Sequence, residues 1–231
     1  MSDWISFYDF KHSVIYVNAR HRDVHYRSIA QDIRAYVPSA QANVLDYGCG
    51  EASSADLLAA ACGHLSMVEA APNVRAALAA RYVGNGKISV LTPDEAAARA
   101  PGTFDLIVMH SVAQYLATAE LDRLLAIFRR LLKPDGLVII GDIVPPRLAA
   151  PMAALALLRF GAANEFFLAA VFGLMRIFVS DYLRLKKRHG LSHYTEAAML
   201  ARLAAAGFVA TRAARNIGHN QWRMTFLGRA V

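Results

Sequence analysis

The chain has 231 residues, 56% of them hydrophobic, which is enough apolar material for one α/β domain with one good core. Lys and Arg exceed Asp and Glu by seven, a balance that suits an acidic partner such as a nucleic acid or an anionic membrane surface without selecting one. Cys49 and Cys62 give neither a disulfide framework nor a metal-ligand spacing, and the first ten residues lack the basic and apolar regions of a signal peptide, so we expect a reducing, cytoplasmic compartment.

Aromatic and imidazole side chains are frequent in the segment that precedes the first expected strand. Apolar positions recur at helical spacing over residues 22–37, and Pro38 ends that run. We therefore expect residues 1–38 to form an N-terminal helical cap. His21 and His25 would share one face of a helix, as two zinc ligands can, but no cysteine pair or H-E-x-x-H sequence accompanies them. We expect them to line a substrate pocket, and we expect no metal site.

Residues 44–52, V-L-D-Y-G-C-G-E-A, read as a buried parallel strand that ends in a tight glycine turn. An alanine- and leucine-rich helix over residues 53–62 is expected next, ending at Gly63. Such a strand, turn and helix bind nucleotides, because glycines let a ligand approach the backbone and the helix offers free N–H groups. Asp46 would repel a phosphate, however, and the third glycine position of the dinucleotide fingerprint holds Ser53. A cationic or neutral ligand therefore suits this turn better.

The stretch resembles motif I of the class I S-adenosylmethionine (SAM)-dependent methyltransferases, in which an acid stands two positions before G-x-G. The matching residues are Asp46, Gly48 and Gly50. The resemblance implies SAM as cofactor, with S-adenosylhomocysteine (SAH) as its product, and a turn that passes close to the amino acid part of SAM. It also implies that a cap residue reaches the cofactor carboxylate, and Tyr16 and Arg20 are the candidates.

A second short strand, residues 65–69, ends in Glu69 about twenty residues past the glycine turn. A carboxylate at this place can accept hydrogen bonds from both ribose hydroxyls of a nucleoside, and Glu69 matches the second-strand acid of the family. Pro72 opens the next helix, and a third strand is expected over residues 88–91. The resemblance places Asp94, which follows that strand, beside the adenine.

The fourth expected strand, residues 104–109, ends where the strand order of such a sheet reverses and ligands bind. His110 follows directly and is the candidate for a cofactor contact and for a general base, which is needed only if the acceptor must lose a proton. The candidates for substrate binding beside it are Ser111, Gln114 and Tyr115. Nucleic-acid amino methyltransferases carry N/D/S-P-P-Y/F here, so the sequence M-H-S-V counts against such a substrate.

The remaining elements complete an α/β fold, a doubly wound, mostly parallel sheet of seven strands whose last hairpin partner is antiparallel. They are a helix over 119–132 capped by Thr118, a strand over 137–144, a helix over 195–206, and strands over 208–212 and 222–227. We expect one methyltransferase domain over residues 1–231 with a helical insertion at 147–190.

The insertion contains two apolar runs, residues 148–158 and 166–179, and both are too short to span a bilayer. The second has apolar residues at helical spacing, which predicts a lid with an apolar underside; they are Phe166, Phe167, Val171, Leu174, Met175 and Phe178. The basic run that follows would suit peripheral contact with the inner face of an anionic membrane; it comprises Arg184, Lys186, Lys187 and Arg188. Extra core or a homodimer interface would explain the same apolar runs without a membrane.

The sequence thus predicts a SAM-dependent methyltransferase for a small, partly apolar acceptor, without a nucleic-acid partner. An NAD(P) oxidoreductase would need a different glycine pattern and a catalytic set that is not found. Two competing functions stay open, a non-catalytic SAM-fold subunit that binds a partner and an RNA methyltransferase supported by charge alone. The sequence does not identify the acceptor, nor whether O, N, C or S is methylated.

Overall fold

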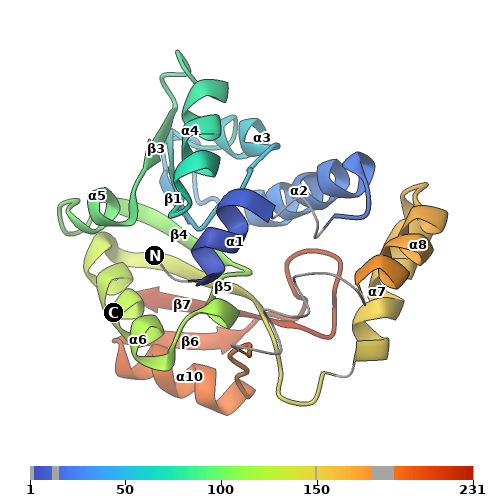
Figure 1. The fold of residues 1–231 in the computed structure, drawn as a ribbon. Helices are drawn as coiled ribbons and strands as arrows, with labels where there is room; N and C mark the ends of the chain where they lie inside the picture. The colour runs from blue at the N-terminus through green and yellow to red at the C-terminus, as the bar shows by residue number, and fades with distance from the viewer. Residues whose placement is uncertain (1–2, 12–15, 149, 178–189, 231) are drawn as a thin grey trace.

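Seven strands form one sheet in the order β3-β2-β1-β4-β5-β7-β6 in a computed structural model that describes residues 3–11, 16–148, 150–177 and 190–230 (Figure 1). The strands are β1 Asn43–Tyr47, β2 His64–Val68, β3 Ile88–Leu91, β4 Phe104–His110, β5 Leu132–Ile143, β6 Phe208–Arg212 and β7 Met224–Ala230. β1 to β5 pair in parallel, and β7 runs antiparallel to both β5 and β6. The predicted fold class is confirmed.

Several helices begin where the sequence supplies a cap or a proline. Asn18 accepts a hydrogen bond from His21 N at 2.8 Å, Pro72 opens its helix, and Thr195 caps another. The helices are α1 Asp3–Lys11, α2 Ala19–Arg34, α3 Ala55–Ala59, α4 Pro72–Arg81, α5 Pro93–Ala97, η2 Ala113–Tyr115, α6 Thr118–Leu131, α7 Ala150–Ala163, α8 Phe167–Ile177 and α10 Glu196–Ala205.

Two local predictions were wrong. The helix expected over residues 53–62 is only the five-residue α3, because the backbone after the glycine turn is still in turn conformation at Ser53 and Ser54. Thr118 is the first residue of α6 rather than its cap. The helix start is instead closed by Glu120, whose carboxylate accepts a hydrogen bond from Ala117 N at 2.7 Å.

The sheet is buried on both faces, as a parallel sheet requires. One face carries a core that includes Leu45, Ile107 and Phe128, and the other a core that includes Val44 and Leu65. Because β1 lies between β2 and β4, the strand order reverses between β1 and β4, and the carboxyl ends of these strands define the place where a ligand binds in such sheets.

Helices from outside the sheet surround these carboxyl ends (Figure 1). Two hydrogen bonds hold α1 in place. Asp9 accepts one from Asn73 N of α4 at 2.6 Å, and the Tyr8 hydroxyl donates the other to the Tyr115 hydroxyl at 2.7 Å. On the opposite side, α7 and α8 form a helical hairpin. The loop before β7 lies between this hairpin and the sheet, and its His219 stacks on Phe160 of α7 at a centroid distance of 4.5 Å.

The lid helix is apolar on two faces, which corrects the single underside predicted from its sequence. Phe166 and Ala170 are buried, and Gly173 packs on Val17. The other face is exposed, with exposed fractions of 71% for Leu168, 66% for Phe172 and 56% for Met175. Phe167 and Met175, assigned to the underside, are thus largely exposed. No helix in the described part of the chain is long and apolar enough to cross a membrane.

We predict that Phe128→Ala lowers the free energy of unfolding by about 3–5 kcal/mol, because the ring is fully buried and packs against Tyr47 at a centroid distance of 5.2 Å. Phe172→Ala is the matched control and should change it by less than about 0.5 kcal/mol, since this ring is exposed. Urea denaturation measures both. Equal losses in the two variants would contradict this placement of the core.

Candidate functional site

Tyr26 of α2 contacts the glycine turn through its hydroxyl group. Gly48 and Gly50 adopt the left-handed φ values of +74° and +61°. A Cβ atom at Gly50 would lie 2.8 Å from the Tyr26 hydroxyl, and this hydroxyl accepts a hydrogen bond from Glu51 N at 3.0 Å. Tyr16 donates to Tyr26 at 3.1 Å, so the predicted Tyr16 reaches the turn through Tyr26. Tyr26 was not singled out from the sequence, because it reads as one apolar position of the helix.

Asp46 and Glu69 stand at the ends of β1 and β2 beside this turn. Burial and the nearby Glu69 carboxylate raise the pKa of Asp46 to about 7. Glu69 accepts from Gly50 N at 3.0 Å and from Ala71 N at 2.8 Å, yet burial still raises its pKa. A carboxylate has about four lone-pair sites, so these backbone donors leave Glu69 able to accept from a ligand as well. The pair is a buried acidic site that would gain from a cation and from hydroxyl donors.

Two other predicted cofactor residues lie in different surroundings. Arg20 donates to Glu165 at 2.8 Å and to the carbonyl of Asn164 at 2.9 Å, so it joins α2 to the turn between α7 and α8. Asp94 is exposed in the first turn of α5, just after β3. Its charge nevertheless acts on Tyr47 at the end of β1, whose pKa is raised to about 12 by burial, Asp94 and Glu69.

A polar network occupies the ends of β4 and β5. Asp142 accepts hydrogen bonds from Ser111 at 2.6 Å and from Asn216 at 3.3 Å, and it pairs with Arg223. Burial alone would raise the pKa of Asp142, but Arg223, His110 and these hydrogen bonds together hold it below its ordinary value. Ser111 and Asp142 have φ values of +59° and +66°, and such backbone strain in non-glycine residues is concentrated at functional sites.

Both ring nitrogens of His110 are engaged in this network. Nε2 lies 3.2 Å from the carbonyl oxygen of Ile217, which can only accept, so Nε2 carries the proton. Nδ1 lies 3.1 Å from Ser111 Oγ, whose own hydrogen points to Asp142. The structure therefore shows His110 as a link between β4 and the loop before β7.

The two other substrate candidates beyond β4 also have protein partners. Gln114 is buried, donates to the carbonyl of Ser111 at 3.3 Å and accepts from Arg223 at 3.3 Å. Tyr115 contacts α1 through the Tyr8 hydroxyl and through the Trp4 ring at a centroid distance of 4.6 Å. Asp142 and Arg223 were missed in the sequence. The signal for Asp142 was an acid at the end of an apolar strand, as at Asp46, whereas no pattern marks Arg223.

Three imidazoles meet between α2, the loop before β7 and the α7–α8 hairpin. The ring centroids of His21, His25 and His219 lie 5.7–6.3 Å apart, and His21 stacks on Phe166 at 5.0 Å. Burial lowers the pKa of His21 and of His219 to about 4, and neighbouring imidazoles add to this effect. Within the described ranges no group of His, Cys, Asp or Glu side chains has the arrangement of a metal site.

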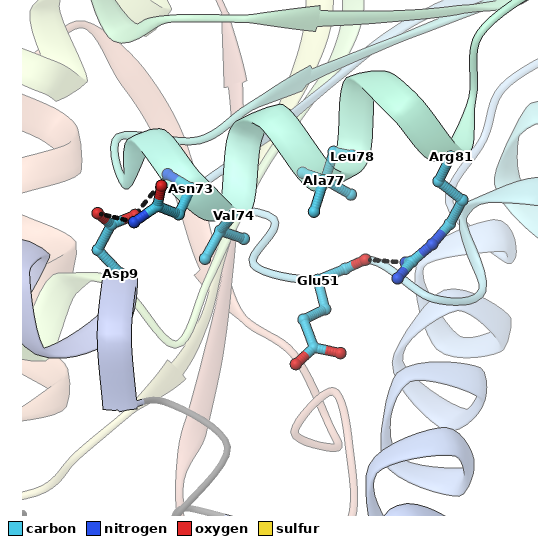
Figure 2. A pocket seen from close by; sticks show the side chains of 7 residues that line it. All are labelled: Asp9, Glu51, Asn73, Val74, Ala77, Leu78 and Arg81. Carbon is cyan, nitrogen blue, oxygen red and sulfur yellow. Dashed lines mark hydrogen bonds between the residues drawn. The ribbon is translucent and has the colours of Figure 1, made fainter.

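Asp46, His25 and His110 are only partly accessible to solvent, and burial is the largest cause of the pKa shift of each. In a sheet of this topology ligands bind in the crevice outside the carboxyl ends of the central strands, and these three side chains lie at that end of the sheet. A separate pocket of about 190 Å³ lies between α1, the glycine turn and α4 (Figure 2). None of the residues predicted from the sequence as site residues lines it.

Comparison with known proteins relates the central part of the chain to one family. A sequence profile described as a methyltransferase domain matches residues 45–140. A search of curated proteins finds no match.

Solved structures share the fold at low sequence identity. The magnesium protoporphyrin IX methyltransferase ChlM of Synechocystis, with bound SAM, is 12% identical with a TM-score of 0.63, over 99% of this chain and 95% of that one. The amino pentose methyltransferase CalS10 of Micromonospora echinaspora, also with bound SAM, is 17% identical with a TM-score of 0.59, over 93% and 92%. The YcgJ protein of Bacillus subtilis is 16% identical with a TM-score of 0.57, over 81% and 70%.

Proposed function

We propose that the chain is a class I SAM-dependent methyltransferase that methylates a small molecule with a substantial apolar body. The observation that carries the proposal is the crevice at the strand ends, where polar groups of β4 and α2 meet the aromatic rings of the α7–α8 hairpin. Phe160 and Phe166 contribute these rings, which contact each other at 5.5 Å. A few polar groups set in an aromatic wall are typical of small-molecule sites.

The acidic end of the crevice fits the cofactor. Asp46 is buried, and no basic side chain of the described residues pairs with it, so the ammonium group of SAM would supply the missing charge. Glu69 has lone pairs left for the ribose hydroxyls, and Gly50 leaves the backbone open to the ligand. For Tyr16 we propose a contact with the amino acid part of SAM, since its partner Tyr26 lies on the turn. For Arg20 and Asp94 we propose no direct contact with SAM, because Arg20 bonds to the turn between α7 and α8 and Asp94 is exposed on α5.

When bound, SAM supplies an electrophilic methyl group on a positively charged sulfur. Methyl transfer is an in-line displacement, so the main task of the protein is to hold the acceptor in line at about 3 Å. Gln114 and Ser111 are fixed by Arg223 and Asp142 and are proposed to orient the acceptor. α1 packs Trp4 against Tyr115 and so shields this end of the sheet from water.

The raised pKa of Asp46 predicts a pH-dependent affinity for SAH, which carries the same ammonium group. Below about pH 7 the free protein holds Asp46 protonated, and binding a cation must release that proton. The affinity should therefore rise as the pH increases from 5.5 to 7, by up to about tenfold per pH unit, and then level off. Isothermal titration calorimetry in two buffers of different ionisation enthalpy measures both the affinity and the released proton.

Asp46→Asn is the control for this prediction. It should bind SAH more weakly and release less proton over the same pH range, because the amide does not titrate. A wild-type affinity that is flat from pH 5.5 to 7 would contradict the placement of the ammonium group beside Asp46.

The acceptor class is tested with SAM labelled in its methyl group. The labelled cofactor is incubated with the enzyme and either the small-molecule extract or the total RNA of the expression host. We expect label in the part of the extract that passes into organic solvent. Gly50→Val should give none, because its Cβ would crowd the Tyr26 hydroxyl at a strained φ of +61°. Label in RNA or only in water-soluble products would contradict the proposal.

The exposed face of α8 supports peripheral contact with an anionic membrane as part of this function. Leu168, Phe172 and Met175 follow helical spacing and lie on the surface, where a large apolar face usually marks a contact site. The basic run at residues 184–188 comes shortly after this face in the chain, although it lies outside the described residues. Apolar contact followed by positive charge is typical of interfacial helices.

We predict that the protein sediments with vesicles of an anionic phospholipid at low salt and that Phe172→Glu abolishes this binding. Val209→Glu is the matched control, since Val209 is equally exposed on β6 and should have no effect. If both variants sediment with the vesicles to the same extent, α8 is not the part of the protein that contacts the membrane. A wild-type dimer that Phe172→Glu converts to a monomer, without vesicle binding, would instead favour the homodimer through the insertion.

A further inference from the structure

His25 of α2 has a buried ring nitrogen that lacks a hydrogen-bond partner among the described residues. Its Nδ1 atom is inaccessible to solvent and makes no hydrogen bond with any described residue. The ring contacts Tyr16, Tyr26 and His219 at centroid distances of 5.7–5.8 Å, so it is held by packing. Buried polar atoms are nearly always paired in native proteins, and an exception calls for a ligand or a role in catalysis.

The position of His25 is tied to the cofactor turn. The next residue, Tyr26, accepts the hydrogen bond from Glu51 N in the glycine turn, and both residues lie on the second turn of α2. The helix therefore fixes the imidazole relative to the turn that we propose to hold the amino acid part of SAM. The ring nitrogens of His110, the base expected from the sequence, instead lie beside protein atoms, Nε2 at 3.2 Å from the carbonyl oxygen of Ile217 and Nδ1 at 3.1 Å from Ser111 Oγ.

The charges around His25 keep it neutral. Burial and the imidazoles of His219, His110 and His21 hold its pKa well below the ordinary value, while Asp142 acts in the opposite direction. The phenols of Tyr16 and Tyr26 also face it, and burial raises the pKa of both, so they are uncharged as well. A neutral imidazole has one nitrogen that accepts a proton or a hydrogen bond.

We propose that Nδ1 of His25 accepts the proton of a hydroxyl group on the acceptor, so that the enzyme methylates oxygen on an apolar, hydroxyl-bearing molecule. This inference rests on the proposed function and names the acceptor group. The O–H proton moves to Nδ1, the oxygen forms the bond to the methyl carbon, and the electron pair of the C–S bond stays on sulfur, which gives SAH. The positive charge of the sulfonium disappears as the imidazolium forms, so the net charge of the crevice does not change.

The test compares 2-naphthol with its methyl ether, 2-methoxynaphthalene, as ligands of the SAH complex. Wild-type protein should prefer the naphthol by about tenfold, because the ether has no hydrogen for Nδ1. His25→Leu should lose this preference. His25→Asn places an amide near the position of Nδ1, so it should keep the preference but, with SAM, methylate 2-naphthol at least about 100-fold more slowly than wild type.

His64→Asn is the control, because His64 lies at the opposite end of the sheet on β2 and bonds to Ser89 at 3.0 Å. It should match wild type in binding and in rate. SAH affinity is measured first for every protein. If the wild-type protein does not bind SAH, the proposed function itself is overturned. Three results, each with normal SAH binding, would overturn the role of His25 alone. They are equal affinity of the wild-type protein for 2-naphthol and its ether, no methylation of 2-naphthol by the wild-type protein, and full activity in His25→Asn.

Discussion

Two carboxylates buried side by side are the constraint from which this site is built: no basic group shifts the pKa of Asp46, and the charge of Arg75 only partly offsets the burial of Glu69. Asp46 and Glu69 end adjacent parallel strands, and the strand pairing brings Asp46 level with Met67, two residues before Glu69. Each would be solvated at lower free-energy cost on the surface, as the upward pKa shifts of both groups show. In the function proposed above, a cationic, hydroxyl-bearing ligand would turn this unfavourable pair of acids into a binding site.

The second organising element is α2, which connects three parts of the site that are distant in the chain. Tyr26 contacts the glycine turn, Asp32 accepts a hydrogen bond from Gly218 N at 2.8 Å in the loop before β7, and Arg20 bonds to the α7–α8 turn. One helix thus positions the glycine turn, the loop that carries His219 and the aromatic hairpin relative to one another. A cap with such contacts is an integral wall of the crevice.

The parts of the fold that follow from local patterns could be predicted from the sequence, and those that depend on distant partners could not. The strands, the antiparallel last pair and the glycine turn are specified by apolar runs, glycines and acids close together in the chain. The tyrosine on the turn and the Asp142–Arg223 pair join segments 25 and 81 residues apart, so no spacing rule indicates them. The prediction of a single apolar face on α8 was wrong for a related reason. This helix is apolar all round, so the spacing of its apolar residues does not distinguish the packed face from the exposed one.

The left-handed conformation of Ser111 and Asp142 has a consequence for how this sequence can change over time. Glycine at either position would relieve the strain of the left-handed backbone, which would favour the folded state. Here the same exchange would delete the hydroxyl or the carboxylate that fixes His110, Asn216 and Arg223. Stability and preorganisation therefore compete at these two residues, and we expect thermostable relatives to have gained their stability elsewhere in the chain.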